Sequence, residues 1–454
     1  MKSSSPNSQL SPWTILSWLV GAVIVLVPFH AFLTVWAASV FGHYTEIRLW
    51  KEAILAVVVA AVIAAVIRGR QTRPNREVLR DRMLHVVLLY LSLLMGSSII
   101  AVFVDAASLK AAAYGLLLDA RYIVLFLAAW YVAFRSHWII DHWRQLLLIP
   151  AGLVVGFGLL QFAVLPPDFL THFGYGPDTI AAVQTVDEKD AYQRVQSTLR
   201  GANPLGAYLV IIISACGVLL MRRQTTRRTW LVAVLLLAGL TVLGLTFSRS
   251  AWLGVLAATG WLIWQSIKTA RARQIVILAG AVGILVFAAV GYSLRQNDVF
   301  QNTILHTDEN SQSLTSSNQG HVVASLTGAK DIINKPFGSG TGTAGPASVY
   351  NTESGRSARI AENYFIQIGQ EVGIVGLALF VSVNIAVAAR LWRSRDLVLP
   401  RVLLASLIGI TVVNLLSHAW TDDTLSYIWW GLAGVAIGHE YHKKFVHHDT
   451  PHET

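Results

Sequence analysis

About a dozen apolar segments, each long enough to cross a lipid bilayer as a helix, dominate this sequence. A spanning helix needs about 20 predominantly apolar residues. Charged residues make up only 13% of the chain, whereas a soluble domain carries roughly 25%. The apolar segments are continuous rather than alternating, which disfavours a β-barrel. The chain is therefore predicted to be an all-α integral membrane protein, with about 12 transmembrane helices and a large external loop before the tenth helix.

The expected helices form three groups separated by two long connections. In chain order these are helices 1–5 (1–166), a first loop (167–202), helices 6–9 (203–292), a large loop (293–361), helices 10–12 (362–438) and a tail (439–454). The individual helices are expected at 13–37, 50–67, 84–104, 112–134, 144–166, 203–221, 230–246, 250–267, 275–292, 362–389, 400–418 and 424–438. The first of them is too long for the core of a signal peptide and is expected to be retained. The single cysteine, Cys216, excludes an intrachain disulfide.

Basic residues gather in every second connection between the expected helices, and the net charge is +10. The positive-inside rule places these connections in the cytoplasm, together with both termini. Because topology accounts for the clusters, they do not indicate nucleic-acid binding. The clusters consist of Arg68, Arg70, Arg73, Arg76, Arg80, Arg82, Arg135, Arg144, Arg222, Arg223, Arg227, Arg228, Lys268, Arg271, Arg273, Arg390, Arg393, Arg395 and Arg401.

The first loop and the large loop are then expected on the outer face, where long connections are often functional. The first loop carries an acidic cluster followed by two arginines, namely Asp187, Glu188, Asp190, Arg194 and Arg200. The large loop contains a predicted amphipathic helix, which ends at the proline and glycines of "NKPFGSGTGTAG". Its apolar face comprises Val322, Leu326, Ala329 and Ile333. This helix is expected on the outer membrane surface, as a lid or as a spacer.

Two arginines on the outer face are candidates for binding an anion. Arg249, in "TFSRSAW", occupies a short turn between two apolar helices. An intramembrane arginine is by default a functional candidate, although Arg249 could also snorkel to the interface. Arg200 precedes the sixth helix, for which Asn203 and Pro204 are the predicted N-cap and first-turn pair. Arginines beside a helix N-terminus suit phosphate; the alternative is a surface pair between Arg200 and an acidic residue of the first loop.

Polar residues also enter two of the predicted helices. Asp119 and Arg121 are two positions apart, a poor geometry for pairing, so each is expected to meet a different helix. In "AENYFIQIGQEVGIVGL", the side chains of Asn363, Gln367 and Gln370 share one helix face. Glu362 is expected in the first turn, where the helix dipole favours its anionic form. It could act as a proton acceptor there, or it could only cap the helix.

The segments "RVQSTLRGANPLGAYL", "LTFSRSAWLGVLAAT", "PFGSGTG" and "AENYFIQIGQEVGIVGL" occur in this order, and with them the chain resembles the O-antigen ligase and polymerase superfamily. The resemblance implies a bacterial inner-membrane enzyme that transfers glycans from an undecaprenyl-diphosphate carrier on the outer face. It implies catalytic arginines at Arg249 and at Arg194 or Arg200. Where the ligases usually have histidine followed by asparagine, this chain has Glu362 and Asn363, and polymerases more often have this pair.

The resemblance predicts a metal-independent glycosyltransferase without a cofactor, since the donor is already activated. Its partners would be the lipid-linked glycan, a glycan or lipid-glycan acceptor and membrane lipids, with no nucleic acid. In the predicted mechanism the arginines hold the diphosphate and Glu362 accepts the proton of an acceptor hydroxyl. Further candidates for contacting the diphosphate or the glycan are Arg121, Asn363, Gln367 and Arg48. Arg48 could instead snorkel.

Several alternatives remain open. The chain could be a ligase, a polymerase that extends the lipid-linked glycan, or a non-catalytic transporter of the lipid-linked glycan. A transferase that uses polyprenyl-monophosphate sugars would typically keep acidic residues in its first external connection, where only Glu46 occurs. Asp422 and Asp423 are predicted to form a solvated cap. The histidine-rich end is predicted to be a cytoplasmic tail rather than a metal site.

Overall fold

The computed structural model describes residues 11–69, 72–186, 189–222, 225–294, 297, 317–360 and 362–446. Asp187 and Glu188 of the acidic cluster, residues 298–316 of the large loop, and the last eight residues lie outside this part of the chain. The long helices are α1 (Pro12–Leu26), α2 (His30–Phe41), α4 (Trp50–Arg68), α6 (Arg82–Phe103), α7 (Leu109–Arg135), α8 (Trp138–Ala163), α9 (Ala202–Leu220), α10 (Thr226–Leu245), α11 (Arg249–Ser266), α12 (Ala270–Ser293), α14 (Ser317–Asn334), α15 (Tyr364–Arg393), α16 (Val398–Leu415) and α17 (Asp423–Val446).

The short elements are α3 (Tyr44–Ile47), α5 (Arg73–Leu79), the 3-10 turns η1 (Val27–Phe29), η2 (Phe169–Phe173), η4 (Pro346–Ser354) and η5 (Ala419–Thr421), and the strands β1 (Gln184–Val186) and β2 (Lys189–Arg194). The two strands form an antiparallel hairpin within the first loop, with Gln184 opposite Arg194. The sequence analysis did not predict this hairpin, because its strands are short and largely polar.

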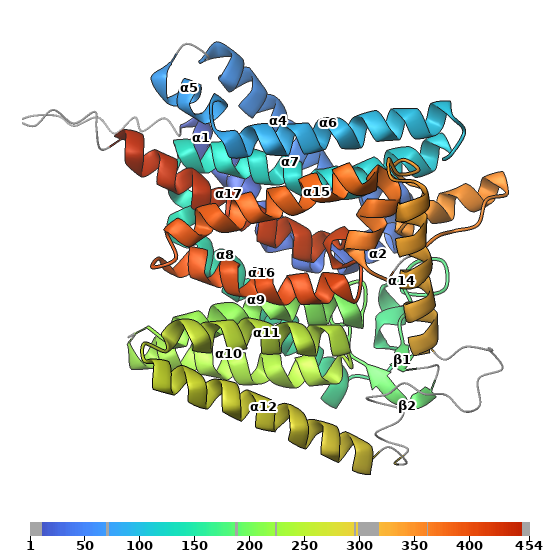
Figure 1. Cartoon of the computed structure of the whole chain (residues 1–454), viewed down its shortest axis with the longest axis vertical. Helices are drawn as coiled ribbons and strands as arrows, with labels where there is room; N and C mark the ends of the chain where they lie inside the picture. The colour runs from blue at the N-terminus through green and yellow to red at the C-terminus, as the bar shows by residue number, and fades with distance from the viewer. Residues whose placement is uncertain are drawn as a thin grey trace, which may run out of the picture.

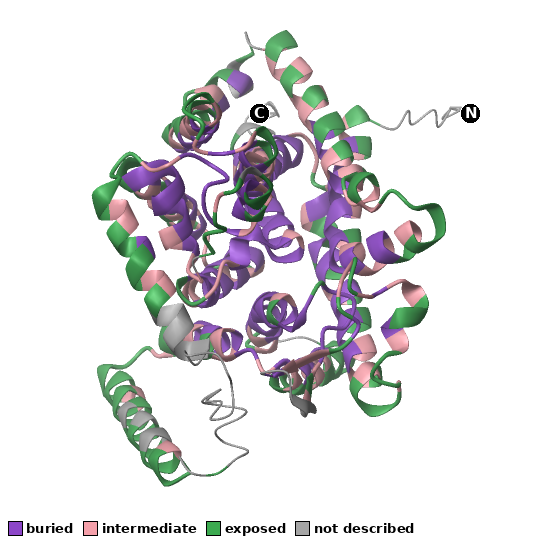
Figure 2. Cartoon of the chain, turned by 90° about the vertical axis from the view of Figure 1, so that its right-hand side faces the viewer, coloured by how far each residue is buried: buried purple, intermediate pink, exposed green. Residues whose placement is uncertain are grey.

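The long helices run side by side in a bundle, and the buried residues lie at its centre (Figures 1 and 2). In the described part of the chain, nine helices are long and apolar enough to cross a membrane: Pro12–Phe41, Trp50–Arg68, Arg82–Phe103, Leu109–Arg135, Trp138–Ala163, Ala202–Leu220, Thr226–Leu245, Tyr364–Arg393 and Val398–Leu415. The all-α membrane class is therefore confirmed. Helices α11, α12 and α17 coincide with the other three predicted spans but are not among the nine, so the count of 12 stays a prediction.

The two long connections meet at one end of the bundle. There α14 runs across the ends of the other helices, and the β1–β2 hairpin lies nearby (Figure 1). Helix α14 covers the predicted amphipathic segment, and the exposed fractions of Leu326 and Ile333 are 60% and 74%. An amphipathic helix that crosses the ends of the spans is suited to lie along a membrane surface.

Close helix contacts fix the helices that carry the candidate site. A Cβ atom built on Gly254 of α11 would lie 2.8 Å from the carbonyl oxygen of Gly409 in α16, and one built on Gly409 would lie 2.5 Å from the carbonyl oxygen of Gly254. Membrane helices use such small residues to bring their backbones together. Helix α7 meets α17 in the same manner, through Gly434 and Gly438.

Helix α15 is broken, whereas the sequence analysis predicted one continuous helix over 362–389. Gly373 has φ 70° and ψ −171°, and the chain from Pro336 to Gly342 docks into the break. The N–H of Gly340 donates to the carbonyl oxygen of Glu371 at 2.7 Å, and the N–H of Ile374 donates to that of Pro336 at 2.8 Å. The break thus exchanges helical hydrogen bonds for bonds to the large loop, which satisfies the backbone inside the bundle.

Candidate active site

A cavity of about 290 Å³ opens at the end of the bundle that carries the two long connections. Its walls come from the first loop, the start of α9, the start of α11, Glu362 ahead of α15, and the end of α16 with the segment that follows it. It is lined by Gln184, Arg194, Arg200, Gly201, Ala202, Asn203, Pro204, Ala207, Ser250, Glu362, Val413, Ser417, His418, Ala419 and Asp422. Segments up to 238 positions apart in the sequence, from Gln184 to Asp422, therefore share one cavity.

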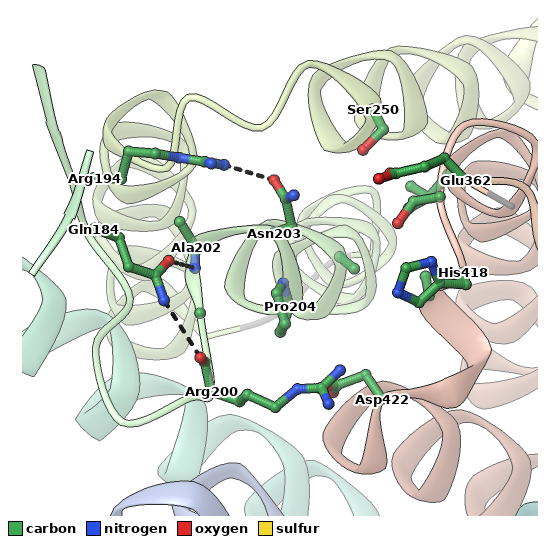
Figure 3. A pocket seen from close by; sticks show the side chains of 15 residues that line it. Gln184, Arg194, Arg200, Ala202, Asn203, Pro204, Ser250, Glu362, His418 and Asp422 are labelled. Carbon is green, nitrogen blue, oxygen red and sulfur yellow. Dashed lines mark hydrogen bonds and ion pairs between the residues drawn. The ribbon is translucent and has the colours of Figure 1, made fainter. Parts of the chain in front are cut away.

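Arg194 joins three parts of this cavity. Its Nε donates to the carbonyl oxygen of Thr246 at 2.8 Å, and its Nη2 donates to Oδ1 of Asn203 at 2.6 Å. The first of these bonds attaches β2 to the turn between α10 and α11, and the second attaches it to α9 (Figure 3). Both bonds fix the direction of the guanidinium, which keeps a positive charge at the cavity wall.

Gln184 organises the start of α9. Its Oε1 accepts from the N–H of Ala202 at 3.0 Å, and its Nε2 donates to Gln196 at 2.9 Å. The prediction of an N-cap at Asn203 is wrong, because α9 begins at Ala202 after Gly201. A glutamine from the hairpin supplies the acceptor that a capping side chain usually provides.

Arg200 lies across the cavity floor toward Asp422, with 3.7 Å between its Nε and Oδ2 of the carboxylate (Figure 3). Oδ1 of Asp422 also accepts from the N–H groups of Thr424 and Leu425, at 3.0 and 3.3 Å. Burial raises the pKa of Asp422 above its ordinary value, and the Arg200 guanidinium opposes this rise. The predicted solvated cap is therefore wrong for Asp422, which is only 6% exposed.

Glu362 faces the same cavity. Helix α15 starts at Tyr364, and Asn363 is its N-cap, accepting from the N–H of Ile366 at 3.1 Å. Asn363 Nδ2 donates to the carbonyl oxygen of Leu415 at 2.8 Å. The N–H of Tyr364 donates to the carbonyl oxygen of Ser417 at 3.1 Å. These bonds place Glu362 beside the segment that follows α16. Because the capping role belongs to Asn363, the helix does not require Glu362 as its cap.

His418 is a lining residue that the sequence analysis missed. It follows α16 and stands four positions before Asp422 in the sequence, and its ring points into the cavity below Glu362 (Figure 3). The signal in the sequence was its position at the end of the predicted helix 400–418, at the same end of the bundle as Glu362. A histidine ring here can donate a hydrogen bond through one nitrogen and accept one through the other.

Arg249 begins α11, immediately before Ser250, which lines the cavity. Arg249 is half-buried and is not among the lining residues. The turn that carries it is fixed by Arg194 through Thr246, and Phe247 takes a left-handed φ of 49° there. Of the four predicted catalytic residues, the structure thus gathers Arg194, Arg200 and Glu362 around one cavity, with Arg249 one residue away from its wall.

Arg121 and Arg48 border a second, smaller cavity of about 70 Å³, which shares Arg200 and Asp422 with the first. Arg121 contacts two carboxylates, Glu52 at 3.1 Å and Asp423, and its Nη2 donates to the carbonyl oxygen of Thr421 at 2.9 Å. Lys51 lies 3.3 Å from the same Asp423 carboxylate. The charges of this buried cluster are largely balanced within it, which favours a structural role for Arg121.

Arg48 stacks on the ring of Tyr114, with 4.9 Å between its Cζ atom and the ring centroid. Asp119 and Arg121 do meet different helices, as predicted: Asp119 Oδ1 accepts from the Tyr364 hydroxyl of α15 at 2.8 Å. Arg121 reaches α4 and α17.

The polar residues of α15 hold the large loop. Gln367 is buried against Gly345 and borders neither cavity, and Gln370 Nε2 donates to Asp331 of α14 at 2.9 Å. Oε1 of Glu371, a residue that the sequence analysis did not single out, accepts from the N–H groups of Gly342 and Ala344 at 2.8 and 3.4 Å. The amide and carboxyl groups of this apolar helix therefore bind backbone and side chains of the loop rather than lipid.

The fold and this cavity define a class of protein, namely a multi-pass membrane protein with guanidinium and carboxylate groups gathered at one end of its bundle. The family model described as O-Antigen ligase matches residues 233–381. The match confirms the resemblance to the O-antigen ligase and polymerase superfamily over this part of the chain, which includes Arg249 and Glu362. Arg194 and Arg200 come from outside the matched segment. No curated protein matches the chain.

Proposed function

We propose that the protein transfers an undecaprenyl-diphosphate-linked oligo- or polysaccharide to an acceptor hydroxyl on the outer face of the bacterial plasma membrane. The observation that carries this proposal is the joint lining of one cavity by Arg194, Arg200 and Glu362. Guanidinium groups suit a diphosphate because they offer paired donors to its oxygens. A carboxylate in the same space suits proton removal from a hydroxyl.

In the proposed reaction the acceptor oxygen attacks the anomeric carbon of the donor sugar. The bond between this carbon and the phosphate oxygen breaks, and the diphosphate leaves on its lipid with inversion at the carbon. Glu362 takes the hydroxyl proton, and Arg194, Arg200 and Arg249 stabilise the charge that develops on the diphosphate. The donor is already activated, so the proposal needs no further cofactor.

An in vitro assay tests this proposal. The full chain in liposomes is given an undecaprenyl-diphosphate-linked glycan and a hydroxyl acceptor, and product is measured for Arg200→Gln. We expect at least a hundredfold loss, because removing one donor to a developing oxyanion costs that much. Arg356→Gln is the matched control, since this arginine of the large loop pairs with Asp105 and borders neither described cavity. Full activity of Arg200→Gln would contradict the proposal.

A deletion strain separates the ligase from the alternatives. Accumulation of lipid-linked polymer with loss of attachment indicates a ligase, and accumulation of single-repeat intermediates indicates a polymerase. A non-catalytic transporter of the same lipid would need no proton acceptor, so it would keep its activity in Glu362→Gln. The ligase is the first proposal because the matching family model carries that description.

A further inference from the structure

A groove of about 750 Å³ lies between α8 and α10, and Leu219 of α9 also lines it. It shares no lining residue with either cavity described above. It is lined by Ile140, Asp141, Trp143, Arg144, Gln145, Leu148, Ile149, Gly152, Leu219, Arg228, Leu231, Val232 and Leu235.

Polar and apolar groups are segregated along this groove. Helices α8 and α10 both begin at the end that the positive-inside rule assigns to the cytoplasm. Arg144 and Arg228 lie within the first two turns of their helices. The wall from Leu148 to Gly152 extends about 12 Å beyond Arg144, at 1.5 Å per residue, and is apolar. The groove is therefore charged at its membrane-surface end and apolar toward the membrane interior.

The charges at the surface end favour an anion. Among the described residues, neither Arg144 nor Arg228 has a carboxylate within ion-pair distance. Asp141 also lines the groove, so the two guanidiniums leave a net charge of one positive unit. Arg228 stands in the first turn of α10, where the helix dipole adds positive potential.

The apolar walls face outward and are open. The exposed fractions of Ile149 and Leu231 are 62% and 59%. A Cβ atom built on Gly152 would meet nothing within 4 Å, so this glycine leaves a recess in the wall. Arg144 is held near the surface by the ring of Trp143, with 5.8 Å from its Cζ atom to the centroid.

From this pattern we infer that the groove binds an anionic phospholipid of the cytoplasmic leaflet. Arg144 and Arg228 would hold the phosphate and the apolar walls would hold the upper part of the acyl chains. Basic pockets between transmembrane helices on this side bind anionic lipid headgroups in the same manner. The inference does not depend on the proposed transfer reaction.

Native mass spectrometry of the full chain tests the inference, with phosphatidylglycerol, phosphatidylethanolamine and phosphatidylcholine of identical acyl chains. We expect at least fivefold higher retention of phosphatidylglycerol than of the other two lipids. The double variant Arg144→Gln/Arg228→Gln should lose this preference. The matched double variant Arg227→Gln/Arg271→Gln, which removes two charges outside the groove, should keep it.

A second variant tests the apolar wall without touching the charges. Gly152→Leu fills the recess and should lower phosphatidylglycerol retention at least threefold, while its open surroundings leave the fold intact. Equal retention of the three lipids by the parent chain would overturn the inference. Unchanged preference in the Arg144/Arg228 variant, or an equal loss in the Arg227/Arg271 variant, would also overturn it.

Discussion

The guanidinium of Arg194 donates through Nε to the carbonyl oxygen of Thr246 at 2.8 Å, and this bond connects the first loop to the turn before Arg249. The neighbouring N–H of Val195 donates to the carbonyl oxygen of Leu245 at 3.1 Å. The turn that carries one predicted anion-binding arginine is thus held by another. The charge of Arg194 and the position of Arg249 are therefore coupled, because moving Arg194 would also move the turn that carries Arg249.

Replacing Arg194 by lysine tests this coupling. Lysine keeps the positive charge but cannot donate to Thr246 and Asn203 at once in the geometry of a guanidinium. We expect glycan transfer to fall at least tenfold in Arg194→Lys and further in Arg194→Ala. Initial transfer rates in liposomes give the measurement, with Arg271→Lys as the control for a basic residue outside the cavity. Equal rates for Arg194→Lys and the parent chain would show that charge alone suffices.

The crossing of α11 and α16 sets the positions of Ser250 and His418 at their ends. Gly254→Leu would place a side chain against the carbonyl oxygen of Gly409. Overpacking of this kind costs about 1–3 kcal/mol, so we expect a lower melting temperature in detergent. Gly260→Leu is the matched control in the same helix, since nothing lies within 4 Å of a Cβ atom at Gly260. Similar melting temperatures for the two variants would contradict this packing.

The break in α15 depends on Gly373. A side chain there would be strained at φ 70° and would meet the carbonyl oxygen of Pro336. We expect Gly373→Ala to release the loop from the break and to expose Ser339. Labelling of an added Ser339→Cys by a water-soluble maleimide should then become faster, because position 339 becomes exposed. The parent cysteine, Cys216, is buried and should contribute little labelling of its own. Gly96→Ala, in an open position, is the control; an unchanged labelling rate in Gly373→Ala would refute the dependence.

Transfer should depend on pH through Asp422. Burial raises the pKa of this carboxyl above 3.8, so lowering the pH neutralises it earlier than an ordinary aspartate. Neutral Asp422 no longer attracts Arg200, and activity should fall as the pH drops through this raised pKa. The same shift means that the folded chain binds this proton more tightly, so Asp422 contributes less stability as pH rises above 3.8.

The variant Asp422→Asn isolates this effect. It keeps an acceptor for the N–H groups of Thr424 and Leu425 but carries no charge at any pH. We expect lower transfer at neutral pH and loss of the acid limb that Asp422 causes. A pH–rate profile of Asp422→Asn that superimposes on that of the parent chain would exclude the Arg200–Asp422 pair from the activity.

The sequence predicted the helices well and their interruptions poorly. Long apolar runs determine where a chain can cross a bilayer, so the positions of the spans follow from composition alone. The break at Gly373 does not, because this glycine lies in an apolar run and its φ is set by the segment of the large loop from Pro336 to Gly342. The N-cap at Asn203 was wrong for a related reason, since the acceptor for Ala202 comes from Gln184 in a distant hairpin.

The candidate site shows the same limit. Charged residues at the ends of helices were visible in the sequence, and Arg194, Arg200 and Glu362 do share a cavity. His418 and Asp422 were missed as lining residues because burial decides their roles, and burial depends on how α16 and α17 pack. Arg121 was predicted to bind ligand because its partners could not be recognised from the sequence. These partners, Glu52 and Asp423, come from segments far away in the sequence.

The most direct test of the account compares transfer with donor binding in Glu362→Gln. This variant keeps the size of the side chain but cannot accept the proton, so transfer should fall by a factor of about 10²–10⁴. Binding of the undecaprenyl-diphosphate-linked glycan should stay within about twofold, since the arginines remain. Glu353→Gln, in the large loop and paired with Lys110 at 2.9 Å, is the control and should transfer normally. Parent-like transfer by Glu362→Gln would contradict the account.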